Sequence, residues 1–390
     1  MEFSYPHSDS YQRPSYELAL LGEPTAAQVD DIQGRISAAV SSCGLSIGSD
    51  VALYIRPNEF APRPRVSAAA LFFGGKDLRV PLANLLSRRI PIIPVVSTLS
   101  EVTENLPLEL RSFNALSYND AGPDRVAAAL LECAGLLRRQ RRVFLSYRRE
   151  EARRVALQLF DSLSERQFDV FLDTHGVAPG DDFQSVIWHR LCDSDVLVMI
   201  DTPTYFASRW TSAEFGRALA KNIPVLRIGW PGCDSSPRTA TASHIDLDAL
   251  DIEEAGVITE PVVMKICHQL EVVRSGGIAV RRVNLVGGLA HSVQMIGGSV
   301  EGVGPANGVH LRLPDGCALV VYPAVGVPTS LSLHEAVEHA PNKPVAVIYD
   351  HVGLNSKWLQ HLDWLGGYIS GPRWIKASEA AWQLADWRRE

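Results

Sequence analysis

Two residues four positions apart, Trp210 and Glu214, form a pair that could do chemistry. They stand in the run SRWTSAE, which has the composition of a helix start. Residues four apart on a helix share a face, so an indole and a carboxylate would line one wall of a cleft. A carboxylate there can bind sugar hydroxyls and stabilise a developing positive charge. The alternative interpretation is an exposed glutamate that stabilises a helix N-terminus.

A second candidate group follows the apolar run at residues 143–145, where a predicted strand ends and a helix begins. Arg148 and Arg149 stand at this turn. Guanidinium groups match the geometry of phosphate oxygens, so the pair could hold a pyrophosphate. Glu150 and Glu151 come next, and a surface ion pair with the two arginines is the competing interpretation.

The elements that would position these residues follow a regular pattern. Amphipathic helical patterns separate four apolar runs, which lie at residues 143–145, 168–173, 196–200 and 223–228. Strands that alternate with helices predict a parallel sheet with helices on both faces. Function gathers at the carboxyl ends of strands in such sheets, and the two candidate groups would both lie there.

Three motifs in this order, FLSYRR, VFLD with a following Pro-Gly loop, and SRWTSAE, resemble the TIR (Toll/interleukin-1 receptor) domain. The resemblance implies a flavodoxin-like α/β fold. TIR domains divide into scaffolds that recruit other TIR domains and enzymes that cleave the N-glycosidic bond of NAD. The enzymatic branch carries Trp-x-x-x-Glu at the position held here by Trp210 and Glu214.

The resemblance therefore implies an NAD+ glycohydrolase that releases nicotinamide and ADP-ribose, or a cyclic ADP-ribose, in bacterial antiphage immunity. NAD+ is then the substrate, with no separate cofactor and no metal. Glu214 is the expected catalytic residue. The expected substrate-binding residues are Ser146, Tyr147, Arg148, Arg149, Asp173, Gly180, Phe183 and Trp210. The rival hypothesis is a non-catalytic TIR adaptor that mediates TIR–TIR assembly.

Two further Rossmann-like α/β domains are expected to flank the TIR domain. The predicted division is a disordered tail at 1–15, an N-terminal domain at 16–140, the TIR domain at 141–275 and a C-terminal domain at 280–390. We expect a helix at 260–273, a boundary at Ser275-Gly-Gly277, and a first strand of the last domain at Val283–Gly288. The flanking domains are expected to hold copies together as a homo-oligomer or to sense a nucleotide or protein trigger.

Composition excludes several other classes of protein. Of 390 residues, 46% are hydrophobic and 21% charged, and no apolar run is long enough to cross a membrane. Six scattered cysteines form neither a disulfide framework nor a zinc site, so a reduced cytoplasm is expected. The net charge of −7 argues against general nucleic-acid binding. The basic run 138–142 is interpreted as cations at a helix C-terminus, with a phosphate contact as the alternative.

Overall fold

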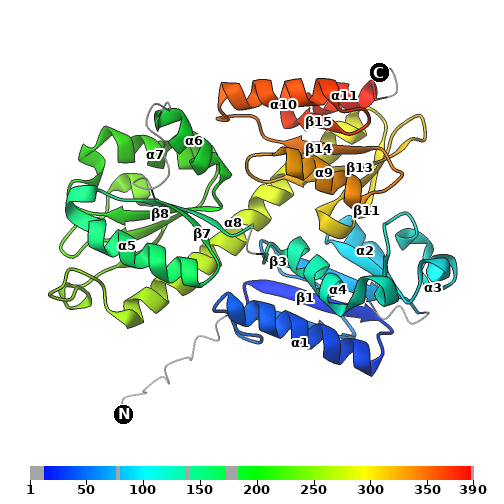
Figure 1. The fold of residues 1–390 in the computed structure, drawn as a ribbon, viewed down its shortest axis with the longest axis horizontal. Coiled ribbons are helices and arrows are strands. Elements are labelled where there is room, and N and C mark those ends of the chain that lie inside the picture. The colour runs from blue at the N-terminus through cyan, green and yellow to red at the C-terminus, as the bar shows by residue number, and fades with distance from the viewer. Residues whose placement is uncertain (1–12, 76–79, 138–139, 173–182, 388–390) are drawn as a thin grey trace, which may run out of the picture.

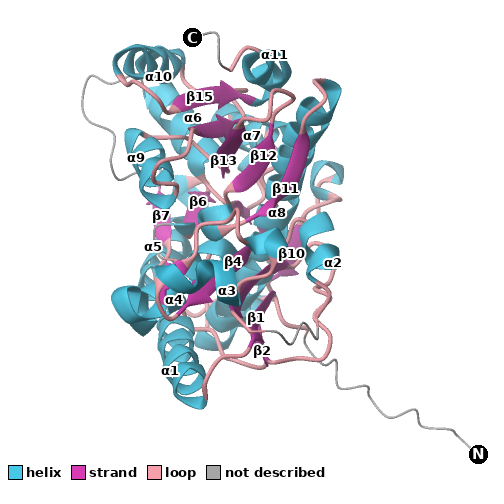
Figure 2. Cartoon of the chain, turned by 90° about the vertical axis from the view of Figure 1, so that its right-hand side faces the viewer, coloured by secondary structure: helices cyan, strands magenta, loops and turns pink. Residues whose placement is uncertain are grey.

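The computed structural model describes residues 13–75, 80–137, 140–172 and 183–387. Three five-stranded sheets, each with its own helices, follow one another along the chain (Figure 1). We call them the N-terminal sheet (β1–β5), the middle sheet (β6–β10) and the C-terminal sheet (β11–β15). The predicted α/β class is confirmed. Figure 2 shows the N-terminal and C-terminal sheets at opposite ends of the molecule.

The middle sheet is wholly parallel, with the strand order β10-β9-β8-β6-β7. This is the flavodoxin-like order 2-1-3-4-5, read from the other edge. Helices α5 and α8 (Glu260–Met295) cover one face, and α6 and α7 cover the other. The strands and shorter helices are β6 (Arg142–Ser146), α5 (Arg149–Glu165), β7 (Asp169–Leu172), α6 (Phe183–Asp193), β8 (Val196–Asp201), α7 (Arg209–Ala220), β9 (Val225–Gly229) and β10 (Ser243–Asp246).

The N-terminal sheet repeats this arrangement. Its order is β2-β1-β3-β4-β5, and all its strands are parallel. This flanking unit is therefore Rossmann-like, as predicted. Its elements are β1 (Tyr16–Gly22), α1 (Ala26–Ser42), β2 (Val51–Ile55), β3 (Ser67–Phe73), α2 (Leu82–Ser87), β4 (Ile92–Val96), α3 (Val102–Asn105), β5 (Leu116–Ser117) and α4 (Tyr118–Ala134).

The C-terminal sheet is mixed. Strands β11, β12 and β13 are antiparallel neighbours, whereas β13, β14 and β15 are parallel. Only its second half therefore has the strand–helix–strand arrangement of the other two sheets. Its elements are β11 (Ser299–Val303), the short turn η7 (Pro305–Asn307), β12 (Val309–Arg312), β13 (Ala318–Ala324), α9 (Ser330–His339), β14 (Val345–Tyr349), α10 (Ser356–Tyr368), β15 (Arg373–Lys376) and α11 (Ala380–Ala385).

One long helix, α8 (Glu260–Met295), runs from the middle sheet to the C-terminal sheet (Figure 1). The predicted strand at Val283–Gly288 is therefore wrong, and Ser275-Gly-Gly277 lies inside a helix. Tertiary packing overrides the low helix propensity of glycine here. A side chain at Gly277 would collide with the ring of Pro224, so glycine allows the helix to approach the middle sheet closely. Among the described helices, none is both long and apolar enough to cross a membrane.

A buried ionic cluster joins α8 to the N-terminal and middle sheets. It consists of Tyr16, Arg141, Asp195, Glu271 and Arg274, all nearly inaccessible to solvent. Arg141 pairs with both carboxylate oxygens of Glu271, at 3.1 Å each. Arg274 lies 3.0 Å from Glu271 and 3.1 Å from Asp195, and it donates to the Tyr16 hydroxyl at 2.9 Å. Residues far apart in sequence thus satisfy one another's charges, as buried ions require.

Candidate functional site

A pocket of about 540 Å³ opens at the carboxyl edge of the middle sheet, close to the point where the strand order reverses between β6 and β8. This is where open α/β sheets bind ligands. One wall is the turn after β6, and the other is the start of α7. The lining residues are Tyr147, Arg148, Arg149, Glu150, Ile187, Ala207, Ser208, Arg209, Trp210, Thr211 and Glu214.

Glu214 lines this pocket, although only 5% of its surface is exposed. The Ser146 hydroxyl, at the end of β6, donates a 2.5 Å hydrogen bond to its Oε2. Ser146 also shares a 2.7 Å hydrogen bond with the Tyr205 hydroxyl. Burial and the neighbouring carboxylate of Glu214 raise the pKa of Tyr205 well above its usual value, so the phenol stays protonated. The carboxylate is thus held in one orientation by a buried chain of hydroxyls.

Trp210 stands one helical turn before Glu214 on α7, as the sequence predicts. The helix begins after Ser208, whose Oγ accepts a 3.3 Å hydrogen bond from the Trp210 backbone N–H. The indole is 40% exposed, and the Arg209 guanidinium lies 4.8 Å from its ring centre. An exposed aromatic face beside a buried carboxylate can receive a planar ligand ring.

The two arginines of the β6 turn have different positions. Arg148 donates to the Thr204 carbonyl at 2.9 Å and lies 3.3 Å from the Glu150 carboxylate. Glu150 is largely exposed, so this ion pair is weak and leaves the guanidinium able to meet a phosphate. Arg149 is exposed at the first position of α5 and also lines the pocket.

For the other predicted site residues, the structure gives less evidence of a position in the pocket. Tyr147 lines the pocket but is 4% exposed and packs in the core beneath it. Phe183 is the first residue of α6. Asp173 and Gly180 lie outside the described residues. The substrate roles of these four residues stay predictions.

The sequence did not predict that the loop at residues 201–205 holds Ser146 and the start of α5 in place. Besides the Tyr205 contact, the Thr204 hydroxyl donates a 2.5 Å hydrogen bond to Glu151 of α5. Burial would raise the pKa of Glu151, but the nearby Thr202 hydroxyl and the groups of Thr204 outweigh it and lower the pKa. Glu151 is therefore charged and ties the start of α5 to the loop after β8. The only signal in the sequence was the place of this loop at the end of a predicted strand.

The fold and the site define a parallel α/β domain with a polar pocket at its carboxyl edge. A protein-family model for the TIR domain matches residues 143–258, which include the whole middle sheet except its first residue, Arg142. The middle unit is a TIR domain, as its motifs indicate. No curated protein matches the chain. A TIR domain fits either TIR-based signalling or NAD cleavage, because TIR domains commonly self-associate and bind NAD+.

Trp210→Ala is expected to weaken substrate binding without unfolding the protein. Loss of aromatic stacking on a ring typically costs about 1–3 kcal/mol, so the NAD-cleaving hypothesis predicts that KM for NAD+ rises about tenfold, with a smaller rise for Trp210→Phe. A fully buried tryptophan would instead cost about 3–5 kcal/mol of folding stability. Steady-state kinetics beside thermal melting separates the two. A large drop in melting temperature with normal activity per folded molecule would mean that Trp210 is a core residue.

Proposed function

We propose that this protein is an NAD+ glycohydrolase that cleaves the bond between nicotinamide and ribose. The observation that carries the proposal is the carboxylate of Glu214. It is buried in the TIR pocket, oriented by Ser146, and lies one helical turn from an exposed indole.

The reaction makes modest demands that these residues can meet. Cleavage passes through an oxocarbenium-like state, as in glycoside hydrolysis, and a water molecule then forms the new C–O bond at the anomeric carbon of the ribose and releases a proton. Nicotinamide leaves as a neutral molecule from a cationic pyridinium, so no general acid is needed to expel it. Glu214 would hydrogen-bond the ribose hydroxyls and stabilise the positive charge as it develops. Trp210 would pack against a ring of the substrate, and Arg148 and Arg149 would hold the pyrophosphate.

Release of nicotinamide from NAD+ by the purified full-length chain tests the proposal. The assay is run on the free protein and on protein clustered through a fused oligomerisation tag. If nicotinamide is released in either state, and the release depends on Glu214, the result supports the NAD+ glycohydrolase proposal. A folded chain that releases none, even when clustered, would leave the adaptor hypothesis in its place.

Specific activity is expected to rise with protein concentration. The resemblance to TIR enzymes implies a cleft that a neighbouring copy completes, and linkage raises the effective concentration of copies to about the millimolar range. Activity per molecule is measured over a dilution series, beside the apparent mass from light scattering. Activity per molecule that stays constant while the mass changes would show that one TIR domain holds a complete site.

A further inference from the structure

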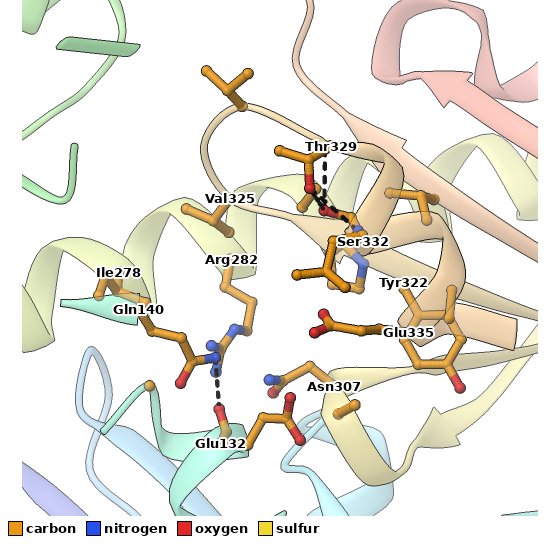
Figure 3. Close-up of a pocket in the computed structure, with 18 of the residues that line it drawn as sticks. Glu132, Gln140, Ile278, Arg282, Asn307, Tyr322, Val325, Thr329, Ser332 and Glu335 are labelled. Atoms are coloured by element: carbon orange, nitrogen blue, oxygen red, sulfur yellow. Dashed lines mark hydrogen bonds between the residues drawn. The ribbon is translucent and has the colours of Figure 1, made fainter. Parts of the chain in front are cut away.

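A second cavity, of about 310 Å³, lies where the three units meet, and it shares no lining residue with the pocket of Glu214. Its floor is the carboxyl end of β13 and the start of α9, and its sides come from α4, α8 and β6 (Figure 3). The carboxyl end of a parallel strand followed by a helix N-terminus is a common place for a ligand. The side chains that point into this cavity determine whether it can bind a ligand and of which kind.

Asn307 gives the strongest evidence. Its side chain points into the cavity (Figure 3), and the residue is only 6% exposed. Its Oδ1 atom is buried and has no hydrogen-bond partner among the described residues. An unpaired buried amide oxygen destabilises the folded state, so a native structure normally gives it a partner. A ligand with an N–H donor would supply one.

Arg282 provides the complementary charge. It comes from α8, reaches the same cavity, and donates to the Cys133 carbonyl at 2.7 Å. It makes no ion pair with any carboxylate in the described part of the chain. Burial lowers the pKa of Arg282, which reflects an undercompensated cation. An anionic group on a ligand would pair with it.

Acidic and apolar groups complete the lining. Glu132 and Glu335 lie on opposite sides of the cavity (Figure 3), Asp195 lines it as well, and His339 lies 3.8 Å from Glu132. Carboxylates in nucleotide sites accept hydrogen bonds from ribose hydroxyls. Val325 and Ile278 contribute apolar side chains to the wall of the cavity. The cavity thus combines an amide, a cation, hydroxyl acceptors and apolar surface.

We propose that this cavity binds an adenine nucleotide. Asparagine amides pair with the amino group and ring nitrogen of adenine, which would satisfy Asn307. The carboxylates suit the ribose, and Arg282 suits the phosphate. The site is separate from the TIR pocket that contains Glu214, and the proposal does not depend on cleavage of NAD+.

The ligand would also bridge the units. Arg142, the first residue of β6, lines the cavity and donates to the Val325 carbonyl at 3.2 Å. Asp193 accepts from Arg142 at 2.5 Å and from the Val327 backbone N–H at 3.0 Å. A molecule bound against these contacts stabilises the junction of the TIR domain with the C-terminal sheet. Binding should therefore raise the melting temperature of the whole chain.

The test uses the full-length chain, with AMP, adenosine and inorganic phosphate as separate probes. AMP is expected to bind by calorimetry and to raise the melting temperature, with smaller effects from adenosine or phosphate alone. Absence of AMP binding would overturn the proposal. So would a phosphate effect as large as that of AMP, because it would mean that the base is not recognised.

Asn307→Gly locates the ligand. Asn307 has a φ of +60°, which glycine adopts without strain, so the variant should fold. It is expected to lose AMP affinity by about tenfold or more, the usual effect of losing a two-point contact to a base. Asn342→Gly is the matched control, since Asn342 is exposed and has a φ of +65° in the same unit. AMP binding that survives Asn307→Gly but is lost in Trp210→Ala would place the nucleotide in the TIR pocket and contradict the proposal.

Discussion

Replacing Glu214 with glutamine is expected to lower the rate of nicotinamide release by about a hundred- to a thousandfold, the usual effect of removing one preorganised electrostatic stabiliser. Glutamine keeps the shape of the side chain and an oxygen that can accept from Ser146, so the hydrogen bond to β6 survives. The variant loses only the negative charge that faces the forming oxocarbenium ion. Single-turnover kinetics with saturating NAD+ measures the effect on the chemical step.

Glu150→Gln is the matched control for this change. Glu150 lines the same pocket, but 81% of its side chain is exposed, and water screens its charge. Its removal should change the rate by less than about threefold. Equal losses in the two variants would mean that the net charge of the pocket matters and not the carboxylate of Glu214. A folded Glu214→Gln protein that turns over at the normal rate would contradict the assignment of the site.

The local patterns of the TIR domain were sufficient to predict strands β6 to β9 and the start of α7, but they missed the edge strand β10. Alternating apolar runs identify a parallel sheet, and the spacing of Trp210 and Glu214 places both on one helix. The hydroxyl chain behind Glu214 was not predictable in the same way. Ser146 and Tyr205 are separated by 59 residues, and a serine or tyrosine has no periodic pattern that identifies its partner.

Helix α8 and the buried ionic cluster show a second limit. The glycines at 276, 277, 287 and 288 indicate turns from local propensity, yet packing against Pro224 and the C-terminal sheet keeps the helix continuous. The basic run 138–142 was interpreted as cations at a helix end. Arg141 is instead fully buried, where it pairs with Glu271. These two residues are 130 positions apart in the sequence, so the pairing could not be read from the local pattern. Long-range charge pairing of this kind leaves no signal in a single sequence.

The buried ionic cluster carries the largest expected effect on stability. Arg274→Met keeps much of the side-chain volume but removes the cation that faces Glu271, Asp195 and Tyr16. It also leaves the carbonyl groups of Gly135 and Gln140 without their donor from Arg274. Removing one member of a buried ion network typically costs about 3–5 kcal/mol, because the remaining charges stay buried and uncompensated.

Arg35→Met is the matched control, because Arg35 also forms a close ion pair, 2.8 Å from Asp124, but both side chains are exposed. A surface pair of this kind is worth about 0–1 kcal/mol. Urea unfolding of the two variants beside the unmodified chain measures the difference. Equal destabilisation by the two substitutions would show that the cluster contributes no more than a surface pair.

Acid should reproduce part of the Arg274→Met effect. Burial would raise the pKa of Glu271, but Arg141 and Arg274 outweigh it and hold the pKa below the usual value of 4.5. A carboxylate with a depressed pKa stabilises the folded state above its unfolded pKa, and that stability is lost as the pH falls through the folded pKa. The unmodified chain should therefore lose stability below about pH 4.5 more steeply than Glu271→Gln, which cannot titrate there. Because the cluster ties β1, α8 and the TIR domain together, this loss should loosen all three at once. Melting curves of the two proteins between neutral and acid pH measure it, and parallel curves would mean that Glu271 does not contribute to the acid sensitivity.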